Sequence, residues 1–148
     1  MDELEAIRAR MAEFIEAIVR VTWDAEPEVM FALWAHTDEV SCSHPMTGGW
    51  AHGWDEVSAT WTIAAGMGKL AVPPGATQRP VSTIEDVRVR LAPDFALVTS
   101  MYALSLGFPD ASPVRLNMTN ALRKIDGAWK LILHHADKAP ALDSALLP

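Results

Sequence analysis

The hydrophobic pattern of this 148-residue chain changes its period once, near residue 80. Residues 2–22 carry apolar side chains at three- and four-residue spacing, which predicts an amphipathic helix. From residue 81 onward, apolar and polar side chains alternate, as in "VSTIEDVRVRLA", which predicts strands exposed on one face. Because the helical and extended patterns occupy separate halves of the chain, the sequence predicts an α+β fold.

The first half predicts two further helices and one short strand. The segment "DAEPEVMFALWA" predicts a short helix, with Asp24 as its cap and Pro27 in its first turn. The segment "DEVSCSHP" predicts a short strand that Pro45 ends. After a glycine-rich loop, "WDEVSATWTIAAGMG" predicts the third helix of the chain.

The second half predicts a long antiparallel meander. After 81–92, the almost continuously apolar segment "DFALVTSMYALSLGF" predicts a strand buried on both faces, and "SPVRLNMTNALRKI" and "AWKLILHHAD" predict two more strands. The connector "LAVPPGATQRP" is too short to separate domains, so we expect residues 1–148 to form one domain. A strongly curved, mostly antiparallel sheet packed on three N-terminal helices would enclose a cone-shaped pocket.

Composition and charge exclude several classes of function. The formal net charge is −7 and the basic residues are scattered, which argues against nucleic acid or an anionic membrane as a partner. No apolar run approaches the roughly 20 residues of a membrane span, and the N-terminus does not resemble a signal peptide. A single cysteine, Cys42, agrees with a reducing compartment. We therefore expect a soluble, cytoplasmic protein.

Two polar residues interrupt the predicted apolar face of the sheet. Asn120 follows Leu116 and Met118 at inward positions, and a buried amide costs free energy unless its hydrogen bonds are met. Tyr102, the only tyrosine, lies in the middle of a strand and needs a partner for its hydroxyl. Each residue either bonds to neighbouring protein groups or lines a pocket and bonds to a ligand.

The adjacent histidines His134 and His135 lie on the last predicted strand and must point to opposite faces. A two-residue Asp-Gly turn in "KIDGAW" would place His135 on the face of Asn120. A three-residue turn with Gly127 in the left-handed conformation would place His134 there instead. Both turns suit the sequence, so the residues alone leave the choice open. The inward histidine could act as an acid or a base near neutral pH.

The segment "SCSHPMTGGWAHGWDEVSATW", residues 41–61, gathers histidines, glycines and tryptophans. His44 is expected at the end of the short strand, either pointing inward or shielding the pocket. Trp50, His52 and Trp54 are expected around a ligand entrance, and Trp61 is expected to plug the open end of the cone. The candidate ligand-binding residues are Trp34, Trp50, His52, Trp54, Trp61 and Met118.

No sequence motif indicates a metal ion or a cofactor. The chain has no HExxH, no pair of CxxC motifs, no phosphate-binding loop and no dinucleotide fingerprint. It also lacks the strained turn that supports the serine of a hydrolase triad. We therefore expect neither a metal site nor a cofactor.

The 41–61 segment and the later "MTNALRKIDGAWKLILHHADKAP" resemble the two hallmark regions of SnoaL-like proteins, in the nuclear transport factor 2-like superfamily. In the bacterial members that this chain most resembles, an His-Pro step precedes a Gly-Trp helix start. A Thr-Asn pair then leads to a turn of the form dGxW and to a His-His end. The resemblance covers nearly the whole chain.

The resemblance implies a cone-shaped α+β fold, also called cystatin-like, whose outer sheet face commonly forms a homodimer. In the related association domain of calcium/calmodulin-dependent kinase II, pocket arginines fall at Tyr102, Asn120 and Ala136. None of the three is arginine here, which argues against carboxylate binding in that mode. The comparison supports Tyr102 and Asn120 as pocket residues and favours His134 over His135, because Ala136 shares the face of His134.

Enzymes on this fold include ketosteroid isomerase, scytalone dehydratase, limonene epoxide hydrolase and polyketide cyclases. They place an Asp or His base and a Tyr or Asn donor in an apolar cone. Two hypotheses follow for a pocket that takes a small hydrophobic molecule. The chain is a cofactor-independent isomerase, dehydratase or cyclase with candidate catalytic residues His44, Tyr102, Asn120, His134 and His135. Alternatively, it is a non-catalytic ligand-binding or oligomerisation module.

Overall fold

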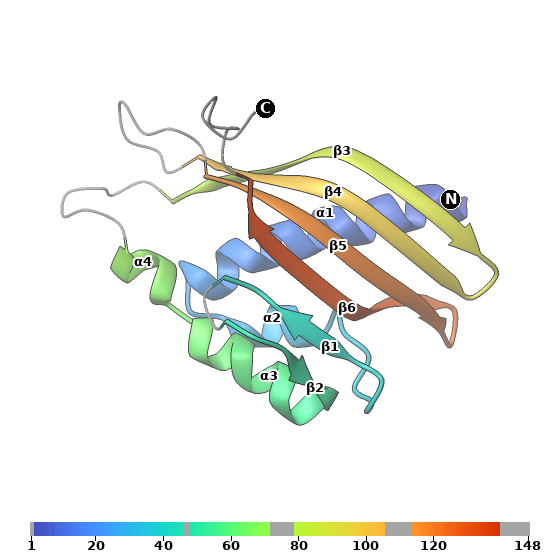
Figure 1. Ribbon diagram of the computed structural model, residues 1–148, viewed down its shortest axis with the longest axis horizontal. Helices are drawn as coiled ribbons and strands as arrows, with labels where there is room; N and C mark the ends of the chain where they lie inside the picture. The colour runs from blue at the N-terminus through green and yellow to red at the C-terminus, as the bar shows by residue number, and fades with distance from the viewer. Residues whose placement is uncertain (1, 46–47, 72–78, 106–113, 140–148) are drawn as a thin grey trace, which may run out of the picture.

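The computed structural model describes residues 2–45, 48–71, 79–105 and 114–139, and six strands in them form one curved sheet (Figure 1). The strand order is β2-β1-β6-β5-β4-β3. The short β1 runs parallel to β6, and every other neighbouring pair is antiparallel. The predicted mostly antiparallel sheet is therefore confirmed. The strands are β1 Ser41–Ser43, β2 Ala51–His52, β3 Val81–Ala92, β4 Phe95–Ser105, β5 Val114–Ile125 and β6 Ala128–Lys138.

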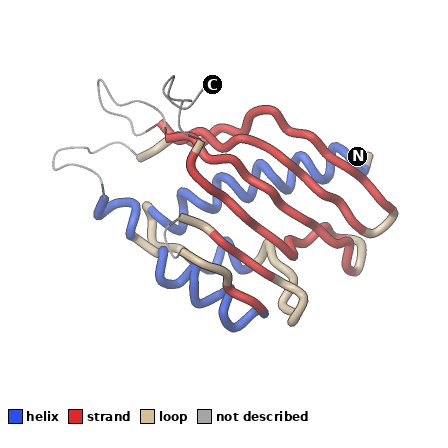
Figure 2. The backbone as a smooth tube through the Cα atoms, viewed as in Figure 1, coloured by secondary structure: helices blue, strands red, loops and turns tan. Residues whose placement is uncertain are grey.

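The described residues form four helices: α1 Glu3–Thr22, α2 Pro27–Phe31, α3 Gly53–Ala64 and α4 Met67–Ala71. Of these, α1 and α3 pack against the sheet, and α2 and α4 pack against α1 and α3. The long α1 crosses one face of the sheet, and α3 lies beside β1 and β2 (Figures 1 and 2). A capping box starts α1: the Asp2 carboxylate accepts from the Glu5 backbone N–H at 2.7 Å, and the Glu5 carboxylate accepts from that of Asp2.

The helices differ from the sequence prediction in two places. The third predicted helix is divided into α3 and α4, because Gly66 lies between them with a left-handed φ of 78°. Asp24 does not cap α2; its carboxylate accepts a hydrogen bond from Arg79 at 2.9 Å instead. Pro27 does occupy the first turn of α2, as predicted.

The hydrophobic core lies between α1 and the inner face of the sheet. Ile7, Met11 and Phe14 of α1 are fully buried. Along β4, the inward residues are buried, while Leu97, Thr99 and Met101 on the other face are partly exposed. The prediction that this strand is buried on both faces is therefore wrong for its described part; residues 106–108, at its predicted end, lie outside the described residues. Residues 72–78 of the predicted connector also lie outside the described residues.

Within the described part of the chain, no helix is long and apolar enough to cross a membrane.

Candidate functional site

A β-bulge in β6 decides which histidine faces inward. The turn is the two-residue Asp-Gly type, since Ile125 pairs with Ala128 and both Asp126 and Gly127 have positive φ. By itself this turn would place Leu133 opposite Asn120 and His135 on the same face as Asn120. The register shifts by one residue between Ala121 and Leu122, leaving Ile132 as the extra residue of β6. Asn120 therefore pairs with His134, the histidine that the family resemblance favoured.

His134 and Asn120 form a hydrogen bond in the core. The Asn120 Oδ1 lies 2.7 Å from His134 Nδ1, and neither side chain is more than 2% exposed. Because an amide oxygen only accepts, Nδ1 carries the proton of the ring, and Nε2 of the neutral ring is an acceptor. Phe14 packs against the same ring, with centroids 4.8 Å apart. The pair thus fixes the position and the tautomer of His134.

Burial keeps both inward histidines neutral. Burial, with smaller contributions from the nearby His44 and His135, lowers the pKa of His134 to about 3. Burial also lowers the pKa of His44 to about 4. At pH 7, His134 is therefore a hydrogen-bond acceptor at Nε2, because its charged form would lose hydration in an apolar surrounding.

A small cavity of about 60 Å³ opens beside His134. A space of this size holds a few water molecules or a small organic group. The His44 ring lies nearly parallel to the Trp61 indole along its wall, with centroids 4.6 Å apart. The described residues that line it are Ile18, Thr22, His44, Pro45, Trp61, Leu116, Met118, His134 and Ala136. None of them carries a charge at pH 7.

Five buried polar atoms of the described residues have no hydrogen-bond partner. They are Trp34 Nε1, Trp61 Nε1, Ser100 Oγ, Tyr102 OH and Asn120 Nδ2. Trp61 lines the cavity, and Ser100 lies opposite Met118 in the ladder between β4 and β5. Unpaired buried donors of this kind are rare in folded proteins. Of the five, the Trp61 indole N–H alone belongs to a described residue that lines the cavity.

Tyr102 is buried on the inner face, opposite Leu116 in the ladder. It is not among the described residues that line the cavity. Burial, with a contribution from the Glu16 carboxylate, raises the pKa of its hydroxyl well above the usual range. The structure therefore brings His44, His134, Trp61 and Met118 to one cavity, with Asn120 behind His134, and leaves Tyr102 to one side.

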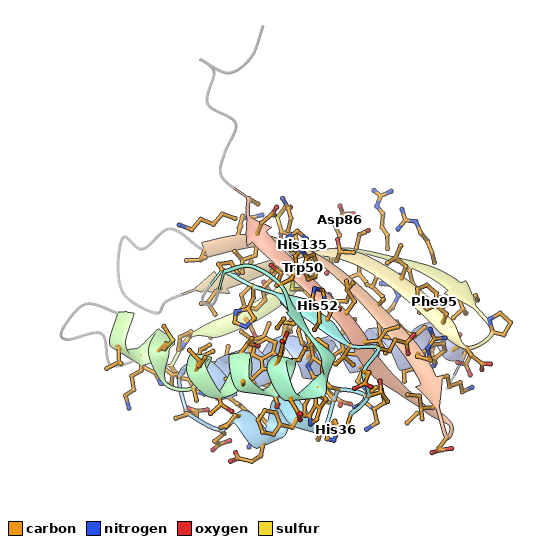
Figure 3. All side chains as sticks on the ribbon, turned by 60° about the horizontal axis from the view of Figure 1, so that its bottom comes forward. His36, Trp50, His52, Asp86, Phe95 and His135 are labelled. Atoms are coloured by element: carbon orange, nitrogen blue, oxygen red, sulfur yellow. The ribbon has the colours of Figure 1, made fainter. Side chains whose placement is uncertain are left out.

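The remaining candidate residues lie elsewhere. Trp50, His52 and His135 share the outer side of the sheet (Figure 3), where the Trp50 and His135 rings have centroids 5.5 Å apart. Trp54 stacks on His36, with centroids 3.9 Å apart. Trp34 is buried in the core and bridges to Leu131 of β6. Trp50, His52 and Trp54 therefore do not form the predicted rim of this cavity.

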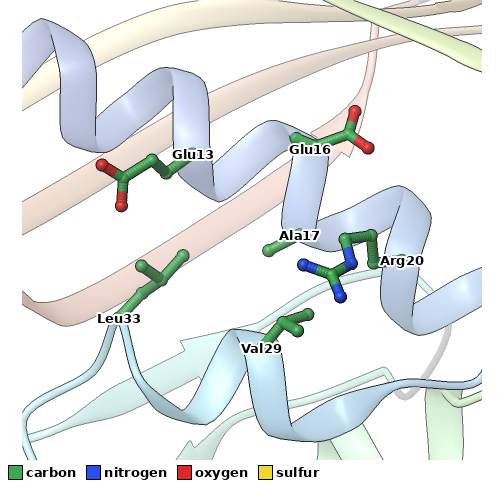
Figure 4. Close-up of a pocket in the computed structure, with 6 residues that line it drawn as sticks. All are labelled: Glu13, Glu16, Ala17, Arg20, Val29 and Leu33. Carbon is green, nitrogen blue, oxygen red and sulfur yellow. The ribbon is translucent and has the colours of Figure 1, made fainter.

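The other hollows have different linings. One of about 430 Å³ brings His52 and Trp54 together, away from His134; it is lined by His36, Thr37, Asp38, His52, Gly53, Trp54, Asp55 and Glu56. Between α1 and α2, a groove of about 210 Å³ is lined by Glu13, Glu16 and Arg20 beside apolar side chains (Figure 4). Arg20 is half exposed there and pairs with Glu26. Among the residues that the structure describes, no group of three or more His, Cys, Asp or Glu side chains is placed to hold a metal ion.

Comparison with known proteins agrees with the fold of this chain. A family model for the SnoaL-like domain matches residues 7–139. The chain belongs to this SnoaL-like family. Comparison with curated proteins gives no match. Solved structures confirm the α+β cone fold of the SnoaL-like domain, because similar structures include nuclear transport factor 2-like and cystatin-like proteins.

Three similar structures illustrate the range of this superfamily. One from Streptomyces avermitilis, described as a dehydratase of the nuclear transport factor 2-like family, is 25% identical; 93% of this chain and 97% of that one align with a TM-score of 0.70. One from Thiobacillus denitrificans is described as a calcium/calmodulin-dependent protein kinase type II association domain. It is 25% identical, and 90% of this chain and 94% of that one align with a TM-score of 0.69. A hub homology domain of that kinase from Chlamydomonas reinhardtii is 20% identical, and 94% of this chain and 100% of that one align with a TM-score of 0.68. These three proteins on this fold are thus described either as a candidate dehydratase or as association or hub domains.

Proposed function

We propose that this chain binds a small, mostly apolar molecule in the cavity beside His134. The observation that carries the proposal is the buried His134–Asn120 hydrogen bond at the cavity wall. A side chain that only filled the core would not need a polar ring, since Leu or Phe fills the same space without a desolvation cost. The pair instead supplies one oriented acceptor in an apolar surrounding, which is the usual composition of a ligand site.

Catalysis by proton transfer is the second candidate function. The likeness to a protein described as a dehydratase favours it, as does the unprotonated Nε2 that a general base requires. In such an isomerase, dehydratase or cyclase, His134 would take a proton and Asn120 would hold its ring in place. A pKa of about 3 makes His134 a weak base, so bound substrate would have to raise that pKa for efficient transfer.

We further propose that the outer face of the sheet joins two copies of the chain. The likeness to proteins described as association domains supports a homodimer. Trp50 is 52% exposed on that side, beside His135, and a large exposed aromatic side chain is typical of an interface. Light scattering of the wild-type chain and of Trp50→Glu would test this assembly, and a monomeric wild type would exclude it.

A high-resolution crystal structure of the full chain tests the binding proposal. Density for a molecule within hydrogen-bond distance of His134 Nε2 would support it, and the shape of that density would indicate the ligand class. Protein side chains that fill the cavity and bond Nε2 would overturn it. Catalysis is tested separately, by measuring whether candidate substrates are converted to product by the wild type and by His134→Phe.

A further inference from the structure

The polar groups at the cavity also indicate what kind of molecule it takes. The described lining residues include no Asp, Glu, Lys or Arg, so none of these residues offers a fixed charge to pair with a charged ligand. An ion placed there would lose its hydration without gaining a counter-ion from these residues, which disfavours a charged ligand. The lowered pKa values of His44 and His134 have the same physical cause.

The hydrogen-bonding inventory at the wall is directional. His134 has its Nδ1–H engaged by Asn120 and therefore presents an acceptor at Nε2. Trp61 lines the same cavity, and its indole N–H is a buried donor without a partner. The Trp61 and His134 rings have centroids 6.0 Å apart, so one small group can lie against both.

We infer that the ligand is a neutral molecule with a hydroxyl group, which donates to His134 Nε2 and accepts from Trp61 Nε1. A hydroxyl is the smallest neutral group that both donates and accepts. Its hydrocarbon part would lie against Ile18, Leu116 and Met118 of the wall. This inference rests on the proposed binding function and restricts it to uncharged alcohols, phenols or enols.

The test uses three probes of nearly the same shape: cyclopentanol, cyclopentanone and cyclopentylammonium. Each is titrated into the full chain with ¹⁵N-labelled histidine, and long-range ¹H–¹⁵N spectra report the ring nitrogens. We expect cyclopentanol to shift the His134 Nε2 signal saturably and to leave Nδ1 protonated. The ketone cannot donate to Nε2, so its affinity is expected to be about tenfold lower. The ammonium ion is expected to leave the His134 signals unchanged.

A pair of variants separates the cavity from the rest of the chain. His134→Phe keeps a ring but removes Nε2, and we expect it to abolish the preference for the alcohol over the ketone. His135→Phe changes the next residue of the strand, on the outer face, and should keep that preference. If His134→Phe does not fold, the wild-type probe ratio and the Nε2 shift still decide the question.

The outcomes distinguish this inference from the proposed function. Equal or tighter binding of cyclopentylammonium at His134 would overturn the neutral hydroxyl ligand and leave the binding site standing. So would equal binding of the ketone and the alcohol. If no probe shifts any His134 signal at saturating concentration, the cavity is not a binding site, and both proposals fail.

Discussion

His134 and His135 are neighbours on β6, yet they occupy opposite environments. His134 is 2% exposed, bonds to Asn120 and lies against Phe14. His135 is half-buried on the outer face, beside the exposed Trp50. The same side chain is thus a fixed, neutral acceptor on one face of the sheet and a surface group on the other. Orientation within the sheet, more than residue type, determines what each imidazole can do.

The two tryptophans of these environments should differ most in their contribution to stability. Trp61 is 2% exposed and contacts Phe14, Trp34 and His44, so Trp61→Ala is expected to lower the free energy of unfolding by about 4 kcal/mol. In the dissociated monomer, Trp50→Ala should lower it by less than about 1 kcal/mol, because half of that side chain is exposed in the single chain. Urea denaturation measures both, and similar losses would show that the outer face is as tightly packed as the core.

The histidines themselves give the second contrast. His134→Ala removes a buried ring and leaves Asn120 Oδ1 without its donor, and we expect a loss of about 3 kcal/mol. His135→Ala should change the free energy of unfolding by no more than about 0.5 kcal/mol. The same denaturation series applies, with circular dichroism as a check of fold. A larger effect at His135 would reverse the assignment of the two faces.

The pH dependence of stability should come largely from the inward histidines. Their folded-state pKa values, about 3 for His134 and about 4 for His44, lie below the ordinary value of 6.5. At pH values between 6.5 and these folded-state values, the unfolded chain binds more protons than the folded chain. The contribution of the two histidines to stability is therefore complete above pH 6.5 and decreases as the pH falls. Between pH 7 and pH 5, the lowered pKa of His134 alone should reduce the free energy of unfolding by about 2 kcal/mol.

Denaturation at pH 7, 6 and 5 checks this slope. His134→Phe should lose its share of the pH dependence, and His135→Phe should keep the wild-type slope. The carboxylates of Glu3 and Glu39, whose pKa values are lowered by hydrogen bonds to Lys124 and Arg123, should contribute only below about pH 4.5. A flat profile between pH 7 and 5 would mean that His134 is solvated in the folded state.

The smallest expected effect is at Ser100, on the inner face of β4. Its buried hydroxyl has no partner, so Ser100→Ala removes an unsatisfied group and should be neutral or stabilise by a few tenths of a kcal/mol. Thr99→Ala, one residue away on the outer face, is the matched control and should be within about 0.5 kcal/mol of wild type. A loss above about 1 kcal/mol at Ser100 would show that its hydroxyl has a partner in solution, such as a buried water.

Much of the fold follows from the sequence, because its evidence is local. The helical period of residues 2–22 predicted α1, and the alternation in 81–92 predicted β3 with the bounds that the structure shows. The burial of Asn120 on the inner face also followed from alternation with Leu116 and Met118. The break at Gly66 was missed, because one glycine in an otherwise helical pattern is often tolerated.

The site was less predictable, because it depends on long-range register. The Asp-Gly turn was one of the two predicted, but no residue type marks the bulge at Ile132, and only the family resemblance pointed to His134. The placement of Trp50 and His52 was also missed. It depends on β2, a two-residue strand too short to leave an alternating pattern.

The bulge at Ile132 acts as a change of phase within β6. Every residue after it, including His134 and Ala136, exchanges faces as a block relative to an uninterrupted ladder. The length of the hairpin turn therefore does not by itself decide which residues of β6 face the cavity. A one-residue change in the turn can be offset by gaining or losing this bulge. An alignment with a chain that lacks this bulge needs a gap at this point of the strand, or it will equate an inward residue with an outward one.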